Sequence, residues 1–174
     1  MKSLSVLFPE AGKVEVREEE VAPPEAGEVF CRAEKSLISI GTECYCLQGV
    51  FDPGTNWANW VRYPFRPGYS MSARVVGVGS GVAGVKEGDR VSVWTPHQQY
   101  FKVQPDHIYP IPDGLSDEEA TWACLACTTQ LAARRGELQL GESVGVVGLG
   151  IIGQLTSQYL LVNGARRVVA IDTV

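Results

Sequence analysis

Apolar and polar residues alternate over short stretches in the first two thirds of the chain, which is typical of half-buried strands. The predicted strands cover residues 3–8, 13–18, 28–36, 73–78, 90–93, 100–103 and 108–111. Turn signals such as Gly79-Ser80-Gly81 and Pro112-Asp113-Gly114 separate them. Short strands at this spacing favour a barrel-like or sandwich domain over residues 1–115.

The hydrophobic pattern changes after residue 115. Ser116 and Glu119 have the spacing of a capping box, and residues 118–135 have helical composition. An apolar strand at 144–147 then leads into a helix over 152–163 and a second apolar strand at 167–171. Strand, helix and strand in this order open a doubly wound parallel sheet, so residues 116–174 are predicted to be α/β.

Three glycines lie where the first of these strands meets the helix. Gly148, Gly150 and Gly153 have the G-x-G-x-x-G spacing of a dinucleotide-binding turn. The first permits a tight turn, the second lets backbone approach a pyrophosphate, and the third lets the helix pack on the strand. The helix N-terminus, with Ile151 and Ile152, then offers free N–H groups to phosphates.

Asp172 ends the second strand of this unit, about 20 residues after the glycines. An acidic residue at that place binds the 2′-hydroxyl of an adenosine ribose and repels a 2′-phosphate. The expected cofactor is therefore NAD, with NADP as the open alternative.

The predicted α/β region is small for its type. Two strands and one helix cannot cover the faces and edges of a doubly wound sheet. We therefore expect the chain to be a fragment of a longer protein, or to need a second chain.

Composition excludes several classes of function. The 174 residues are 45% apolar and carry a net charge of −5 without a basic block, which argues against nucleic acid and anionic membranes as partners. No apolar run reaches transmembrane length, and no signal-peptide cleavage site follows the N-terminal strand. Five cysteines without a secretory signal indicate free thiols in a reducing compartment, so the predicted location is the cytoplasm.

Two further motifs carry a family resemblance. Residues 76–91 read VGVGSGVAGVKEGDRV, and residues 111–116 read IPDGLS ahead of the predicted helix and the glycine turn. This order resembles the medium-chain dehydrogenase/reductase superfamily of the zinc alcohol dehydrogenase type. The resemblance implies a GroES-like β-barrel catalytic domain over residues 1–115 and the opening of a Rossmann domain over residues 116–174. It also implies NAD(P)-linked hydride transfer to or from a small-molecule substrate, and a homo-oligomer when full length.

The chain departs from this family at the zinc ligands. Ile40 stands where the family places its first cysteine ligand, and Tyr69 stands where it places a histidine. The third position falls near Cys124. Because a catalytic zinc needs three protein ligands, the resemblance points to a member without zinc. Zinc-free quinone oxidoreductases are such relatives, so the substrate is expected to be a carbonyl, an alcohol or an activated alkene.

The resemblance also suggests catalytic residues. Thr42 matches a position that relays protons in the zinc enzymes, although its hydroxyl could equally cap a local turn. Tyr69 and Tyr45 are expected to line the cleft, as proton donors or as aromatic walls. The alternative to an enzyme is a dinucleotide-binding or structural protein without catalytic activity, or an inactive fragment.

Other side chains have two interpretations each. Cys44, Cys46, Cys124 and Cys127 could build a four-cysteine metal site, or behave as small hydrophobic residues. Trp57, Trp60 and Tyr63 recur every third residue, which indicates packing or a lid over a large or aromatic substrate. His97 precedes a strand, where surface or turn packing is favoured over a role as proton donor.

Overall fold

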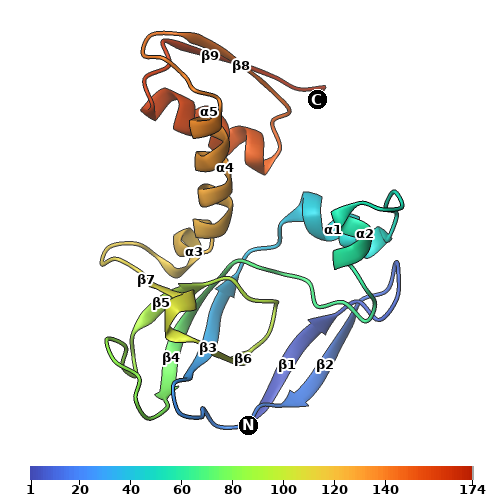
Figure 1. Cartoon of the computed structure of the whole chain (residues 1–174), viewed down its shortest axis with the longest axis vertical. Coiled ribbons are helices and arrows are strands. Elements are labelled where there is room, and N and C mark those ends of the chain that lie inside the picture. The colour runs from blue at the N-terminus through green and yellow to red at the C-terminus, as the bar shows by residue number, and fades with distance from the viewer. Residues whose placement is uncertain (174) are drawn as a thin grey trace. The chain divides into compact units, whose positions relative to one another are not determined.

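The structure, a computed structural model, describes residues 1–173 (Figure 1). The chain divides into two compact units, Met1–Trp122 and Ala123–Val174. The sequence placed the change from β to α/β character at residue 115, and the division into a catalytic and a coenzyme domain stays a prediction. No helix within residues 1–173 has both the length and the apolar character needed to cross a bilayer.

The first unit is built on a five-stranded antiparallel sheet with the order β6-β3-β4-β5-β7. Its strands are β3 (Val29–Ser36), β4 (Met71–Val78), β5 (Arg90–Val93), β6 (Tyr100–Val103) and β7 (Ile108–Pro110). One face forms the main core, because residues two apart on each strand point to the same side. Phe101, Cys31 and Val75 show this as a buried row across three neighbouring strands. The predicted strands in this region are thus confirmed, to within two residues at their ends.

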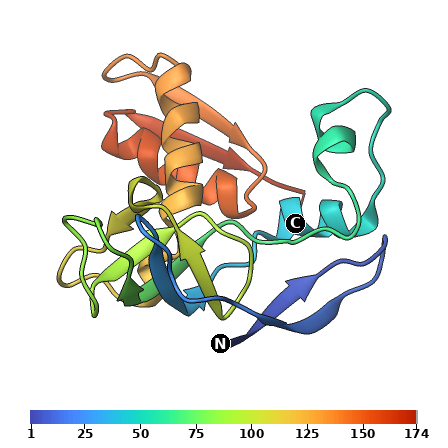
Figure 2. The ribbon, with the colours of Figure 1, turned by 60° about the horizontal axis from the view of Figure 1, so that its bottom comes forward.

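A second sheet pairs β1 (Lys2–Leu7) with β2 (Glu15–Glu20) in antiparallel register. Figure 2 shows it as a hairpin apart from the larger sheet. The segment before β6 joins the two sheets, because Val6 N–H donates to the His97 carbonyl and Gln99 N–H donates to the Leu4 carbonyl, at 2.9 and 2.8 Å.

The barrel-like or sandwich domain predicted for this region is present as two sheets, and they do not close into a barrel within residues 1–173. The larger sheet is open, with β6 and β7 at its edges. Where β1 approaches β6, the Ser3 hydroxyl donates to the Tyr100 carbonyl at 3.0 Å and accepts from the Tyr100 N–H at 2.9 Å. A side chain thus satisfies the backbone groups that a strand ladder would use, and the ladder does not continue.

Short helices complete the first unit: α1 (Ile40–Gln48), α2 (Asn56–Trp60), the 3₁₀ turn η1 (Pro105–His107) and α3 (Asp117–Ala120). The sequence did not predict α1, which ends at Gly49 in the left-handed conformation with φ 69°. The capping box at the start of α3 is confirmed, since the Ser116 hydroxyl accepts from Glu119 N–H and the Glu119 carboxylate accepts in return.

The single helix predicted over residues 118–135 is interrupted. It forms α3 and a separate α4 (Ala123–Arg135), with the break at Thr121 and Trp122. The Ser70 hydroxyl donates to the Thr121 carbonyl, and Thr121 donates its own hydroxyl to the Glu118 carbonyl. At the break the backbone makes i→i+3 bonds instead of i→i+4 bonds, because Thr121 N–H donates to the Glu118 carbonyl and Trp122 N–H donates to the Glu119 carbonyl, at 3.2 and 3.1 Å.

The second unit contains α4, β8 (Ser143–Val147), α5 (Ile151–Val162) and β9 (Arg167–Ile171). β8 and β9 pair in parallel, with Val144 opposite Val168 and Val147 opposite Ile171. Ala133, Val146 and Leu160 form the buried centre, one from each of α4, β8 and α5. This is the predicted strand–helix–strand unit.

Replacing Met71, which is buried in the main core, tests whether the larger sheet carries the stability of the first unit. Met71→Ala should lower the free energy of unfolding by about 2–5 kcal/mol through lost burial and a residual cavity. Met71→Leu keeps the volume and should cost less than about 1.5 kcal/mol. Urea unfolding curves of both variants provide the comparison, and equal losses would show that this position is not tightly packed.

Candidate functional site

The glycine turn between β8 and α5 has the geometry that the sequence predicted. Gly148 adopts φ +93°, which is accessible to glycine, and its N–H donates to the Ile171 carbonyl at 2.8 Å. A Cβ on Gly153 would lie 1.7 Å from the Gly148 carbonyl oxygen. The helix therefore packs against the turn at a distance that only glycine permits.

The N-terminus of α5 opens on free space. Gly150 is the N-cap residue and no side chain caps the helix. A Cβ built on Gly148 or Gly150 would meet nothing within 4 Å. No side chain thus caps the first-turn N–H groups at the positive end of the helix dipole, and the space beside Gly148 and Gly150 is open, which fits a phosphate or pyrophosphate group.

Asp172 lies beside this turn, directly after β9. Its carboxylate accepts hydrogen bonds from the Leu149 N–H and, at 2.6 Å, from the Thr173 N–H. The carboxylate is therefore at the carboxyl end of both strands, where the turn begins. Its predicted contact with a ribose stays a prediction.

The three hydroxyl groups predicted for catalysis all belong to the first unit. Thr42 lies half-buried in the first turn of α1, and Tyr69 lies half-buried ahead of β4. Tyr45 is exposed and packs edge-on against Phe51 and Trp57, with ring centres 5.6 and 6.2 Å apart. Within residues 1–173 no hydrogen bond joins these hydroxyls, so the structure does not link them in one network and their catalytic roles stay predictions.

The positions matching zinc ligands do not fit zinc. Ile40 begins α1 with an exposed apolar side chain, and Tyr69 offers a phenol. Cys124 is buried in α4, where desolvation raises the pKa of its thiol to about 11. In the region that the structure describes, no group of three or more histidine, cysteine or acidic side chains is arranged to hold a metal.

The four-cysteine alternative is also unfavourable. Cys44 and Cys46 belong to the same helix, but Cys44 is exposed and Cys46 is fully buried. Burial raises the pKa of Cys46 to about 11, which disfavours the thiolate that a metal requires. The same contrast of a buried and an exposed thiol holds for Cys124 and Cys127 on α4.

The aromatic residues around α2 pack on one another. Trp57 lies edge-on to Trp60 at 5.6 Å, and Trp60 lies edge-on to Phe65 at 5.2 Å between ring centres. Tyr63 donates its hydroxyl to the Cys46 carbonyl at 2.5 Å. Packing is therefore one role of this segment. Both tryptophans keep an exposed edge, and a lid role stays a prediction.

The first unit contains a buried chain of hydrogen-bonded polar side chains that was not predicted from the sequence. His97 Nε2 lies 2.8 Å from Glu43 Oε2, and His97 Nδ1 lies 2.9 Å from Ser36 Oγ. The other Glu43 oxygen accepts from the Ser39 N–H at 2.7 Å. Surface or turn packing was the favoured interpretation of His97. The surface position is wrong, because the side chain is buried, whereas packing against the turn at Gly68 agrees with the structure. No local sequence pattern could have shown that His97 pairs with Glu43, because the two residues lie 54 positions apart.

Ser36, Glu43 and His97 line a pocket of about 340 Å³. Its other walls are mostly apolar and include Val6, Phe8, Leu47 and Pro67. Mostly apolar walls with a few convergent polar groups are typical of small-molecule sites.

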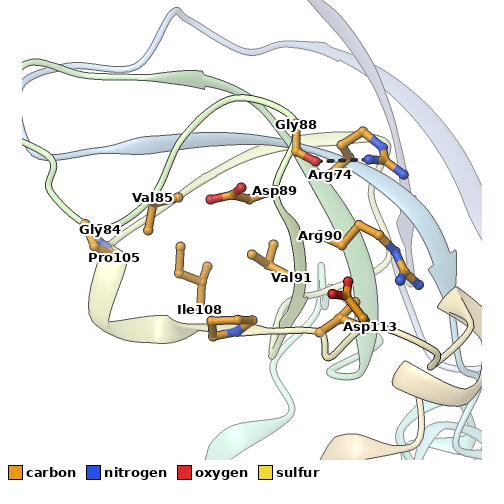
Figure 3. A pocket seen from close by; sticks show the side chains of 12 residues that line it. Arg74, Gly84, Val85, Gly88, Asp89, Arg90, Val91, Pro105, Ile108 and Asp113 are labelled. Atoms are coloured by element: carbon orange, nitrogen blue, oxygen red, sulfur yellow. Dashed lines mark hydrogen bonds between the residues drawn. The ribbon is translucent and has the colours of Figure 1, made fainter.

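Another pocket, of about 590 Å³, lies between β5, β7 and the glycine-rich turn before β5 (Figure 3). Val85, Val91 and Ile108 form its apolar floor. Its arginines are already paired within the fold: Arg74 donates to the Gly88 carbonyl at 3.0 Å, and Arg90 donates to Asp117 at 2.8 Å. Because these charges already have partners, they are not poised to recognise a ligand.

Alcohol dehydrogenases are among the curated proteins to which the chain is similar. No family model matches the chain. An alcohol dehydrogenase from Geobacillus stearothermophilus is 28% identical over 191 residues, covering 91% of this chain and 54% of the relative. The chain thus spans about half the length of the curated relatives that it matches.

Solved structures share the fold. The 2R,3R-butanediol dehydrogenase of Bacillus subtilis superposes with a TM-score of 0.82 at 20% identity, covering 98% of this chain and 63% of that one. A zinc-binding dehydrogenase candidate from Sinorhizobium meliloti 1021, solved with NADP, gives a TM-score of 0.78 at 22% identity over 98% and 56% of the two chains. Other neighbours are named as quinone oxidoreductases and enoyl reductases. The predicted resemblance to alcohol dehydrogenase-like proteins is confirmed.

Thiol labelling tests the burial of the cysteines. Desolvation raises the pKa of Cys31 to about 12 and those of Cys46 and Cys124 to about 11, so these three stay protonated and unreactive near neutral pH. Iodoacetamide at about pH 8 should modify Cys44 and Cys127 in the native protein, and all five cysteines after denaturation. Peptide mass mapping gives the sites, and rapid native labelling of Cys46 would contradict the packing of α1.

Proposed function

We propose that this chain, whose relatives and fold are alcohol dehydrogenase-like, is part of an NAD(P)-dependent oxidoreductase that works without zinc. The observation that carries the proposal is the open glycine cradle at the N-terminus of α5. The turn at Gly148 is tight, α5 packs against it at a distance that only glycine at position 153 permits, and no side chain caps the first N–H groups of α5. These are the three features that dinucleotide binding requires of a strand–helix turn.

Each part of the turn has a role in binding. The backbone N–H groups of Gly150, Ile151 and Ile152 would hold the pyrophosphate, supported by the dipole of α5. Asp172 would accept hydrogen bonds from the adenosine ribose, in addition to its bonds within the turn. A carboxylate there favours NAD over NADP. The bound nicotinamide supplies or accepts a hydride, which the protein itself cannot do.

Zinc independence rests on the donor residues. Ile40 has no ligating atom, and neither Tyr69 nor buried Cys124 is placed in a cluster of metal ligands within residues 1–173. Polarisation of a substrate oxygen then falls to hydrogen-bond donors. Thr42, Tyr45 and Tyr69 are the candidates from the sequence, and all three belong to the first unit.

The substrate class that fits is a carbonyl, an alcohol or an activated alkene. Relatives and neighbours are named for alcohols, a diol, quinones and enoyl groups, which all exchange a hydride. The exposed rings of Trp57 and Trp60 favour a large or aromatic substrate. Cytoplasmic location and homo-oligomerisation of the whole protein stay predictions.

Gly153→Ala tests the cradle. The added Cβ must displace the turn, because it would otherwise lie 1.7 Å from the Gly148 carbonyl oxygen. We expect the affinity for NADH to fall at least about tenfold, measured by NADH fluorescence titration. The matched control is Gly145→Ala on β8, where the Cβ meets nothing within 4 Å. Equal NADH affinities of the two variants would show that the glycine turn is not part of the NADH-binding site.

Asp172→Asn tests the choice of cofactor. Asparagine keeps an acceptor for the Leu149 N–H but loses the charge that repels a 2′-phosphate. NADH binding should weaken by about 1.5–3 kcal/mol while NADPH binding is unchanged or improves. Asp113→Asn, on an exposed turn of the other unit, is the control. Parallel loss of both cofactors would assign Asp172 a structural role only.

Metal analysis tests zinc independence. Protein purified without added metal should contain far less than one zinc per chain, and chelator treatment should leave its thermal stability and NADH-dependent turnover unchanged. Stoichiometric zinc, or activity lost to chelator and restored by zinc, would overturn this part of the proposal. An NADH-binding protein that turns over no aldehyde, ketone or quinone would instead be the non-catalytic alternative.

A further inference from the structure

We propose that Ser36, His97 and Glu43 form a proton relay that serves a substrate oxygen in the pocket they line. The proposal rests on the proposed oxidoreductase function and assigns its proton transfer to residues that the family motifs did not indicate. It also places the substrate, since the pocket beside Ser36 would hold the reacting carbonyl or alcohol.

Both nitrogens of the buried His97 imidazole are engaged. His97 and Glu43 are only 8% and 6% exposed. A carboxylate can only accept, so the nitrogen facing Glu43 carries the hydrogen and the nitrogen facing Ser36 exchanges one with the hydroxyl. A histidine oriented in this way by a carboxylate passes a proton to or from a neighbouring hydroxyl.

Separate segments of the first unit hold the imidazole of His97 in place. His97 N–H donates to the Pro67 carbonyl at 2.9 Å, and its own carbonyl accepts from Val6 at 2.9 Å. A Cβ on Gly68, which has φ +94°, would lie 2.7 Å from the imidazole ring. Glu43 is fixed in turn by the Ser39 N–H. The ring therefore has little freedom to leave its two partners.

The hydrogen bonds from Glu43 through His97 to Ser36 run from the interior of the first unit to its surface, because Glu43 is buried whereas Ser36 is exposed at the end of β3. Ser36 also lines the pocket of about 340 Å³ with its apolar walls. Among the described residues, the ionisable side chains that line this pocket are Glu43, Cys44 and His97. A relay needs such an accessible end, and an ion pair that only stabilised the fold would not.

The proposed step conserves atoms and charge. In reduction, the substrate carbon gains a hydride, and its oxygen takes the proton of the Ser36 hydroxyl. Ser36 is restored by the proton on His97 Nδ1, so one O–H bond forms and one N–H bond breaks. The imidazolium becomes a neutral ring that keeps its hydrogen toward Glu43, and water returns the proton afterwards. In oxidation the same steps run backwards, starting from the neutral ring.

Ser36→Ala tests the accessible end of the relay. Turnover of an aldehyde and quinone panel should fall about 100-fold or more in kcat, with KM and NADH affinity little changed, since general acid–base catalysis contributes about that much. The solvent deuterium isotope effect on kcat should change, because a different proton source replaces Ser36. Ser36→Thr, which keeps a hydroxyl, should restore part of the rate. Ser80→Ala, on an exposed turn, is the matched control.

His97→Ala tests the middle of the relay. It should lower kcat, and added imidazole should restore turnover in proportion to its concentration. His107→Ala is the control, because the His107 side chain is 71% exposed and has only a 4.0 Å contact with Asp106. Nitrogen-15 spectra of the imidazole rings, recorded without cofactor, give a readout independent of activity. Ser36→Ala should shift the Nδ1 signal of His97 and leave His107 unchanged.

The outcomes separate the relay from the proposed function. Wild-type protein that binds no NADH, or binds it and turns over no substrate, overturns the oxidoreductase proposal and the relay with it. Wild-type turnover that Ser36→Ala leaves intact, with an unchanged isotope effect, overturns the relay alone. An unchanged Nδ1 signal does the same, even if His97→Ala fails to fold.

Discussion

The first unit depends on the backbone of three residues, His97 to Gln99. These residues hydrogen-bond to β1 through the His97 carbonyl and the Gln99 N–H, and to β3 through the Gln99 carbonyl, which accepts from Ala33 at 2.8 Å. The His97 N–H also binds the Pro67 carbonyl. One short segment therefore joins the small sheet, the large sheet and the loop ahead of β4. The same backbone positions the imidazole of His97. The hydrogen bonds that join the two sheets therefore also hold the Ser36–His97–Glu43 chain in place.

Interactions between residues close in the chain explain which parts of the structure could be predicted from the sequence. The ranges predicted for β5, β6 and β9 match the structure because each has a clear alternation or apolar run between turn residues. The glycine turn was equally visible, since the constraints on Gly148 and Gly153 are steric and act within six residues. The capping box at Ser116 is local in the same sense. Features of this kind can be predicted from the sequence because the residues that interact to form them lie close together in the chain.

The remaining features depend on contacts between distant residues. The predicted long helix is interrupted at Thr121, whose carbonyl accepts from the hydroxyl of Ser70, 51 positions earlier. α1 begins with Ile40-Gly41-Thr42, residues of low helix propensity, and Glu43 supports that start by accepting from Ser39. Where β1 approaches β6, the Ser3 hydroxyl bonds to the backbone of Tyr100 and the two strands form no continuous ladder. The pairing of His97 with Glu43 is of the same kind, since each looks unremarkable in its own segment.

Gly68 limits which substitutions the loop ahead of β4 tolerates. A Cβ at this position would lie 2.7 Å from the imidazole of His97 and 2.7 Å from its backbone nitrogen, and the backbone of Gly68 has φ +94°. Removing the ring of His97 would therefore not admit a side chain at position 68, because the backbone contact and the left-handed conformation would remain. Among descendants of this sequence, the glycine should persist even where the histidine has been replaced.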